Sequence, residues 1–526
     1  MKRREFLKRS APAVTLPFLM GGVPIRAIGK SSFFEQFVTT GEENNRILVL
    51  VQLNGGNDGL NTIIPLDQYS NLFNARSNVL IPEEKVISLI DDTGLHPSMS
   101  SVHSLFQEKK IGILQGVGYP NPNFSHFRST EIMVSASDAD EVIKTGWLGR
   151  YLDRDYPEYP EGFPNDNTPD PLAITMGAIV STTCQGPITN MGIAISRNDA
   201  LYNLNGEDFG EVPDNNYGHE LSFIRQTQLQ TQLYLQTVSD AASKAQNLSS
   251  LYPEAGENTL ADQLKIVAQL IAGGLQTSIY VVSLGGFDTH AEQIQMGTGT
   301  DTGLHADLLQ KLSDAILAFQ DDLNLLGHED RVVGMTFSEF GRRIRSNISY
   351  GTDHGTSGPV IVFGTSVNPI LQGDNPEIPA SLDQEDNLPM QFDFRSVYGS
   401  ILKDWFCVDE QVISTLLFRD FQYLPVIKTD NVTGLEDEIT DASPLGQNYP
   451  NPANNFTTIK FRSSGGHLEV SLFDFQGKKI ETFINKNIPV GEHELRIDTG
   501  SLRNAIYYYQ MKHANKVFTK KMVVQR

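Results

Sequence analysis

Residues 46–61 read RILVLVQLNGGNDGLN, and this stretch decides the fold. Continuous aliphatic and β-branched runs of this length are typical of strands buried on both faces of a parallel sheet. The run ends among glycines and a carboxylate, Asp58. Because open α/β sheets bind ligands at the carboxyl ends of their strands, Asp58 is the first candidate ligand.

Further runs of the same kind alternate with stretches whose apolar residues recur every three or four positions. The strand-like runs cover residues 110–118, 277–286, 331–337 and 358–364, and the helix-like stretches cover residues 221–246, 260–274 and 308–323. Strands alternating with helices predict an α/β domain with a mainly parallel sheet covered by helices.

Polar motifs follow several of these predicted strands. Ser125 falls near an expected helix start, where free N–H groups and the helix dipole favour an anion or an activated oxygen. Asp288 and His290 stand two apart on an extended segment, so both project to one side and suit one divalent ion. Glu339 lies in SEFGRR and His354 in GTDHG. A lone serine of this kind is commonly a helix cap, and a lone histidine in a loop is commonly a surface residue. Four such motifs at successive strand ends nevertheless favour a functional site.

The chain has 526 residues, which predicts two to four domains, and its formal net charge is −22. Residues 1–30 and 443–526 each carry a net +6, so residues 31–442 carry −34. A body this acidic excludes nucleic acid as an expected partner, because a phosphate backbone would repel it. Two interpretations of the acidity stay open: solubility, or carboxylates gathered around metal ions.

Two cysteines, Cys184 and Cys407, lie 223 positions apart. That spacing fits neither a zinc knuckle nor a CxxC redox pair. They either pair in an exported protein or remain two buried free thiols.

Residues 1–29 predict a cleaved export signal: a charged start, MKRREFLKRS, a short apolar stretch and a polar exit. The arginine pair followed by Phe-Leu-Lys resembles the twin-arginine signal, which implies the twin-arginine export machinery as partner. An ordinary Sec signal is the alternative. No later segment approaches about 18 unbroken apolar residues, so we expect no transmembrane segment in the mature chain.

The chain after residue 426 predicts a linker and a separate module. Residues 427–442 are acidic and lack apolar periodicity, whereas residues 443–526 contain short alternating runs separated by turn residues, a pattern typical of an all-β, Ig-like sandwich. The block LGQNYPNPANNFTTIKF with the terminal KKMVV resembles the type A sorting domain of the type IX secretion system. This resemblance implies transit through the periplasm, the type IX machinery as partner, and delivery to the cell surface or the medium. A carbohydrate-binding or spacer module is the alternative.

The central residues resemble a known family as well. The motifs LNGGNDGLNTIIP, YPNPNFSHFRSTE, TGWLGRYL, GGFDTH, FSEFGRR, GTDHG and DFRSVYGSILKDW occur in order. In this order they are similar to the domain of unknown function 1501 family, placed in the alkaline phosphatase and sulfatase superfamily. The resemblance implies an alkaline-phosphatase-like domain over residues 30–426.

The resemblance also implies roles for the candidate residues. Asp58 would bind one metal ion, Ser125 would be the nucleophile, and Asp288 and His290 would bind the other ion, although the superfamily usually separates such ligands by three residues. Glu339 stands where an Asp-His pair is expected, and His354 matches the last histidine ligand.

Departures from the superfamily pattern affect the second metal site and the chemistry. Phe340 occupies the position of an expected histidine, so that site is weak, vacant or selective for a harder, oxygen-preferring ion. The CxPSR-like sulfatase signature is absent, because the turn reads NFSHFR. Arg128 and Arg342, with Arg343, suit bidentate binding of a substrate anion, or else pair with neighbouring carboxylates.

Together these features predict an exported hydrolase of phosphate or sulfate esters that uses divalent metal ions and acts on a small anionic ester. Zinc, calcium, magnesium and manganese are not distinguished by the sequence, and His126 and His305 are each equally well explained as site, capping or surface residues. The alternatives are a metal-binding surface protein that has lost catalysis and acts in binding or assembly, and a purely structural scaffold.

Overall fold

The computed structural model divides into two units, Met1–Asp430 and Asn431–Arg526. It describes residues 45–90, 92–195 and 233–428 of the first unit, with the two-residue strands β1 (Leu19–Met20) and β2 (Val23–Pro24). In the second it describes residues 445, 448, 453, 456–463, 465–474, 478–513 and 516–524. Most of the predicted signal peptide and linker lies outside these residues, so the predicted domain boundaries stay predictions.

The first unit is built on a nine-stranded sheet, in the order β15-β7-β14-β11-β3-β10-β8-β9 with β16 also on β7. Six of its neighbouring pairs are parallel, and β14 alone among the described strands of this sheet runs antiparallel to its neighbours β7 and β11. The predicted mainly parallel sheet is therefore confirmed. The strands are β3 (Ile47–Asn54), β7 (Ile111–Gly118), β8 (Ala173–Met176), β9 (Ile193–Ile195), β10 (Ile279–Gly285), β11 (Val332–Ser338), β14 (Gly358–Phe363), β15 (Leu371–Gln372) and β16 (Phe392–Asp393).

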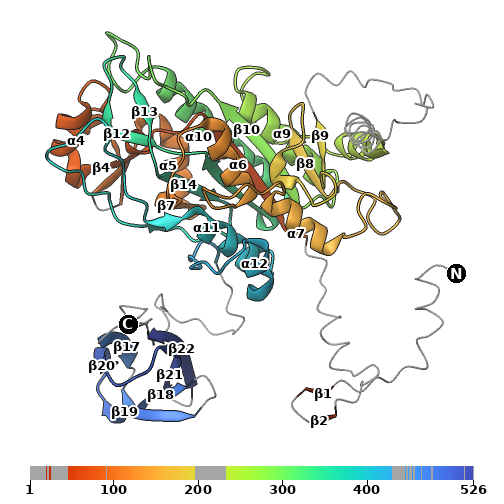
Figure 1. Cartoon of the computed structure of the whole chain (residues 1–526). Coiled ribbons are helices and arrows are strands. Elements are labelled where there is room, and N and C mark those ends of the chain that lie inside the picture. Colours follow the sequence, from red (N-terminus) through yellow and green to blue (C-terminus); the bar gives the residue numbers. More distant parts are fainter. Residues whose placement is uncertain are drawn as a thin grey trace. The chain divides into compact units, whose positions relative to one another are not determined.

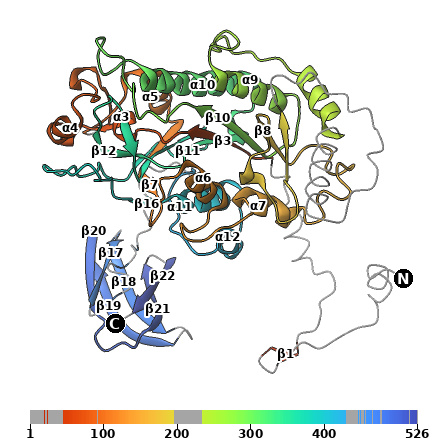
Figure 2. The ribbon, with the colours of Figure 1, turned by 45° about the horizontal axis from the view of Figure 1, so that its top comes forward.

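Helices cover both faces of this sheet (Figures 1 and 2). One face packs against α5 (Ser100–Gln107), α9 (Thr259–Ala272) and α10 (Leu304–Leu326). The other packs against α6 (His126–Ser135), α7 (Trp147–Asp155), α11 (Phe394–Ser400) and α12 (Glu410–Leu416). Each face has its own apolar core, which explains why strands such as β3 are apolar throughout. Of the predicted helix over residues 221–246, the described part is helical at residues 233–244.

The strand register brings four loops to one edge of the sheet. Gly285 of β10 pairs with Asn54 of β3, and Ser338 of β11 pairs with Leu53 of the same strand, so these three parallel strands end side by side. Strand β7 points the same way, because β14 is antiparallel to both β7 and β11. Smaller elements complete this edge: α3 (Gly59–Thr62), β4 (Ile63–Pro65), α4 (Tyr69–Arg76), β5 (Ile87–Ile90), β6 (Thr93–Leu95), β12 (Arg342–Ser346) and β13 (Thr352–His354).

The second unit is all β where it is described, as predicted. Strand β17 (Phe456–Ser463) pairs with β20 (Gly491–Asp498), and β19 (Lys479–Ile488), β18 (Gly466–Asp474), β21 (Ala505–His513) and β22 (Lys516–Val524) form a four-stranded antiparallel sheet. Alternate side chains enclose an apolar core that includes Ile459, Val470 and Tyr509.

Two further expectations are settled by the structure. Cys184 and Cys407 are both free thiols. Cys184 is buried, and burial raises its pKa to about 12, whereas Cys407 is exposed. Across the described parts of the chain, every helix is too short or too polar to cross a membrane.

Candidate metal centre

The loops after β3 and β10 pack directly against each other at the shared sheet edge. Gly55 adopts φ +120°, and a Cβ on it would lie 2.2 Å from the backbone nitrogen of Asp288. Only glycine allows this approach without strain. The phenylalanine before Asp288, Phe287, donates its backbone N–H to Asn54 O at 3.0 Å. The position of Asp288 is thus fixed by backbone packing.

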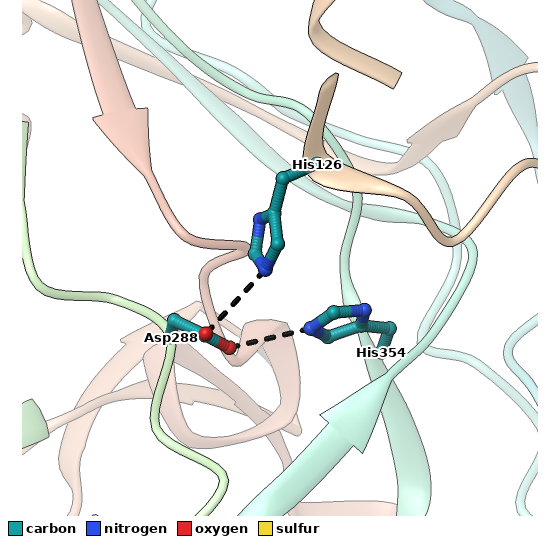
Figure 3. A group of neighbouring side chains, drawn as sticks. All are labelled: His126, Asp288 and His354. Atoms are coloured by element: carbon teal, nitrogen blue, oxygen red, sulfur yellow. Dashed lines mark hydrogen bonds and ion pairs between the residues drawn. The ribbon is translucent and has the colours of Figure 1, made fainter. Parts of the chain in front are cut away.

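Three histidines from different segments converge on Asp288. His354 Nε2 lies 3.3 Å from Asp288 Oδ1, and His126 Nε2 lies 3.4 Å from Asp288 Oδ2 (Figure 3). His290 Nε2 lies 3.3 Å from Asp288 Oδ1 and 2.8 Å from His354 Nε2. One ligand atom from each of His126, Asp288 and His354 lies within 4.8 Å of the other two.

The opposite ring nitrogen of each histidine faces an acceptor. His126 Nδ1 lies 2.9 Å from Glu339 Oε1, His290 Nδ1 lies 2.8 Å from Asp353 Oδ1, and His354 Nδ1 lies 2.7 Å from the carbonyl oxygen of Phe124. Such an acceptor fixes the tautomer with hydrogen on Nδ1, as is usual for histidines that bind a metal through Nε2. Burial would raise the pKa of Asp353, but hydrogen bonds from His290 and Asn347 lower it, so this acceptor is ionised.

The tautomers leave three lone pairs directed at one carboxylate. In neutral imidazoles with Nδ1–H, the Nε2 atoms of His290 and His354 would face each other at 2.8 Å without a hydrogen between them. A cation among the Nε2 atoms and Asp288 satisfies every one of these groups.

The distances fit a bound divalent ion. Ligand atoms about 2.0–2.1 Å from a tetrahedral zinc ion are about 3.3–3.4 Å apart, which matches the contacts of His290 and His354 with Asp288 Oδ1 and of His126 with Asp288 Oδ2. The separation of His290 and His354 is shorter, close to the edge of an octahedron of the same radius. The residues therefore fit the metal that the sequence predicts.

Arg342 organises the loops around Asp288. Its buried guanidinium donates to the carbonyl oxygens of Gly55, Gly56, Phe287 and Thr352 and, at 2.8 Å, to Asp288 Oδ1. Burial opposes ionisation of Asp288, but the hydrogen bond and the positive charge of Arg342 lower its pKa to about 2. Asp288 is consequently ionised at any physiological pH.

Phe340 forms an apolar wall of the cluster. Its ring centroid lies 4.4 Å from that of His354 and 5.0 Å from that of His126, and a Cβ on Gly56 would meet the ring at 2.4 Å. The residue therefore limits how these two imidazoles can rotate.

Ser125 lies beside the cluster in sequence, immediately before His126. It is the N-cap residue of α6, it is exposed, and its side chain makes no capping hydrogen bond. Its hydroxyl is thus not committed to the helix cap, the common role of serine at this position.

Asp58 and Glu339 have protein partners of their own. Asp58 is buried, its Oδ2 lies 2.5 Å from Arg76 Nη2, and it accepts a hydrogen bond from Gln293 at 2.7 Å. Burial would raise the pKa of Asp58, but the charge of Arg76 and the hydrogen bonds from Gln293 and Arg76 outweigh it and lower that pKa. Glu339 Oε1 accepts from the Gly55 backbone N–H at 2.8 Å besides facing His126.

Arg128 and His305 contact other groups. Arg128 binds Glu131 at 3.1 Å and the carbonyl oxygens of residues 138, 139 and 141, which ties this loop to α6. His305 is buried and lies 3.0 Å from Asn57 Oδ1. The anion-binding roles expected of Arg128 and Arg342 stay predictions.

The sequence interpretation did not assign three residues that the structure places at or near the cluster. His126 and Asp353 each adjoin a predicted site residue, Ser125 and His354, so their motifs carried a signal. Arg76 lies in α4, whose sequence YSNLFNAR contains no motif that pairs it with Asp58.

The fold and the cluster define an α/β protein with a candidate metal centre at the carboxyl ends of its parallel strands and a C-terminal β module. Residues 45–417 match the family model described as "Protein of unknown function (DUF1501)", and the chain belongs to this family. Residues 447–525 match the "Secretion system C-terminal sorting domain". This sorting domain implies the secretion machinery as a partner and export to the cell surface or the medium.

The chain is also similar to three solved structures. A protein in the alkaline phosphatase superfamily from Vibrio parahaemolyticus has 9% identity and a TM-score of 0.32, covering 91% of this chain and 82% of its own. The putative sulfatase yidJ from Bacteroides fragilis has 10% identity and a TM-score of 0.31, covering 88% and 90%. The PsFucS1 sulfatase from Pseudoalteromonas sp. has 9% identity and a TM-score of 0.31, covering 89% and 86%. A search of curated proteins found no match.

Proposed function

We propose that this chain is an exported, metal-dependent hydrolase of phosphate or sulfate esters with Ser125 as nucleophile. The observation that supports this most is the convergence of three Nε2 atoms on Asp288, one of them from His126, which directly follows Ser125 at the start of α6. We further propose twin-arginine export and transit through the periplasm before the sorting domain acts.

Each of these residues has a distinct role in the proposed reaction. Asp288, His290 and His354 hold the ion, which would supply Lewis acidity toward an ester oxygen and favour an ionised hydroxyl nearby. Ser125 Oγ loses its proton to solvent and attacks phosphorus or sulfur, and the alcohol leaves. Water then cleaves the seryl ester, releasing phosphate or sulfate and restoring Ser125.

Asp353 and Arg342 position this centre. The Asp353 carboxylate and the Phe124 carbonyl orient the rings of His290 and His354, and Arg342 holds Asp288. Groups of this kind raise ligand basicity and limit ring rotation.

The experiment compares the full chain, purified without chelator, with Ser125→Ala on 4-nitrophenyl phosphate and 4-nitrophenyl sulfate. Ser104→Ala, an exposed serine on α5, is the matched control. We expect turnover that follows added metal, is abolished in Ser125→Ala and is unchanged in Ser104→Ala. Full turnover by Ser125→Ala would contradict the assigned nucleophile.

A second candidate is a metal-binding surface protein without catalysis that acts in binding or assembly. The pairing of Asp58 with Arg76 favours it, because it withholds one carboxylate that the resemblance assigns to a metal. Metal binding without turnover on either ester would support this candidate.

A further inference from the structure

His126 belongs to the metal centre by position and by orientation. Its Nε2 faces Asp288 Oδ2 at 3.4 Å, and its ring meets that of His354 edge-on with centroids 4.5 Å apart. Its Nδ1 faces Glu339, so its tautomer directs the Nε2 lone pair toward the centre.

The segment before α6 is attached to the centre twice. The carbonyl of Phe124 accepts from His354 Nδ1 at 2.7 Å, and His126 extends its own ring to Asp288. Two independent contacts within three residues show that this segment is built against the centre, since a surface histidine would need neither.

Glu339 has the surroundings of a positioning residue. Oε1 accepts from the Gly55 N–H at 2.8 Å and faces His126 Nδ1 at 2.9 Å, while Oε2 lies 3.3 Å from Ser338 Oγ. Oε1 is thus held by a backbone donor while it faces the imidazole, and Glu339 is 4% exposed. Carboxylates that orient a metal-bound histidine have this arrangement.

We propose that His126 is a ligand of the metal centre, oriented by Glu339, so that the centre offers three imidazole nitrogens and one carboxylate. The inference rests on the metal centre of the proposed function. A nitrogen-rich set of this kind suits zinc and its late first-row neighbours, whereas calcium and magnesium prefer six or more oxygen ligands or retained water. The ion is therefore of the zinc class.

The test is titration calorimetry of the metal-stripped full chain with Zn²⁺, Ca²⁺ and Mg²⁺. We expect one equivalent of Zn²⁺ bound more tightly than Ca²⁺ or Mg²⁺. Glu339→Gln should weaken Zn²⁺ binding by about 10–100-fold, as losses of such orienting groups do, and His126→Ala should weaken it at least as much. His103→Ala, a histidine on α5 that contacts Gln107, should bind like the wild type.

The absorption spectrum of bound Co²⁺ separates ligand from positioning residue. His126→Ala should change the ligand-field bands, whereas Glu339→Gln should keep their shape at lower affinity, because the amide oxygen still accepts from His126. A spectrum altered by Glu339→Gln to the same degree would overturn the positioning role. Wild-type Zn²⁺ affinity in His126→Ala, or Ca²⁺ bound more tightly than Zn²⁺, would overturn the proposal.

Two controls keep the result separate from folding and from hydrolysis. Circular dichroism verifies folding, and His126→Gln replaces His126→Ala if the smaller side chain unfolds the protein. Zinc binding without ester turnover refutes the proposed hydrolase and leaves this inference standing. Ester turnover with no metal bound refutes this inference.

Discussion

Replacing Arg76 with methionine tests how the buried carboxylate of Asp58 is stabilised. Both side chains are at most 1% exposed, and Arg76 Nη2 lies 2.5 Å from Asp58 Oδ2. Methionine keeps much of the length and volume of arginine but removes the charge. Asp58 then retains the hydrogen bond from Gln293, while its Oδ1 has no hydrogen-bond partner among the described residues even in the wild type.

The expected loss follows from the burial of the pair. Removing one partner of a buried ion pair costs about 3–5 kcal/mol, because the remaining charge is neither solvated nor paired. Replacing both partners with uncharged residues is commonly neutral or stabilising. The double variant Asp58→Asn/Arg76→Met should therefore recover most of the unfolding free energy that Arg76→Met loses.

The pH dependence gives a second, independent signature. In the wild type the pKa of Asp58 is below its usual value, chiefly because the charge of Arg76 outweighs burial. Without Arg76, burial raises that pKa above its unfolded value, so the folded variant takes up a proton at a higher pH than the unfolded chain does. Its stability then rises as pH falls, and the gap to the wild type narrows from pH 7 toward pH 5.

Tryptophan fluorescence during urea unfolding measures this difference. The chain has two tryptophans, Trp147 and Trp405, and both are buried in the α/β unit, so the signal reports that unit. A loss below about 1 kcal/mol, the range of an exposed ion pair, would refute the reasoning. A gap that stays constant between pH 7 and pH 5 would refute it as well.

Two further predictions concern the same sheet edge. Gly55→Ala places a Cβ 2.2 Å from the Asp288 backbone nitrogen at φ +120°, so we expect this variant to displace Asp288 and to lose bound metal in elemental analysis. Gly327→Ala is the control, because a Cβ there meets open space and the variant should retain the metal. Burial lowers the pKa of His305 to about 4, so between pH 6.5 and pH 4 the unfolded chain binds a proton that the folded chain excludes. The free energy of unfolding therefore falls by about 1.4 kcal/mol for each unit by which the pH is lowered in that window. His305→Gln should flatten the dependence of the unfolding free energy on pH; parallel wild-type and variant curves would contradict this assignment.

The sheet was predictable because its strands are buried on both faces. The runs at residues 46–53, 277–286 and 331–337 need no amphipathic pattern, and they match β3, β10 and β11 to within a few residues. The direction of β14 was not predictable, because a buried run has the same composition in a parallel and in an antiparallel neighbour.

The site was predictable to the extent that it depends on strand ends. Asp288, His290 and His354 meet because parallel strands end at one edge, which the alternation of strands and helices implies. The contacts of His126 depend on the rotation of α6 about its own axis and on the wall made by Phe340, which local sequence does not encode. The pairing of Asp58 depends on α4, whose approach is set by the packing of a separate apolar cluster around Leu72.

The charges at this edge would be balanced by one divalent ion in the proposed centre, whereas the resemblance implies two. Four carboxylates face the loops: Asp58, Asp288, Glu339 and Asp353. Arg76 is paired with Asp58 and Arg342 with Asp288, and the nearby Arg343 is paired with Glu385. With neutral histidines, the negative charges of Glu339 and Asp353 remain uncompensated, and one divalent cation would balance them. Arg76 thus supplies at Asp58 the positive charge that the resemblance assigns to a second ion.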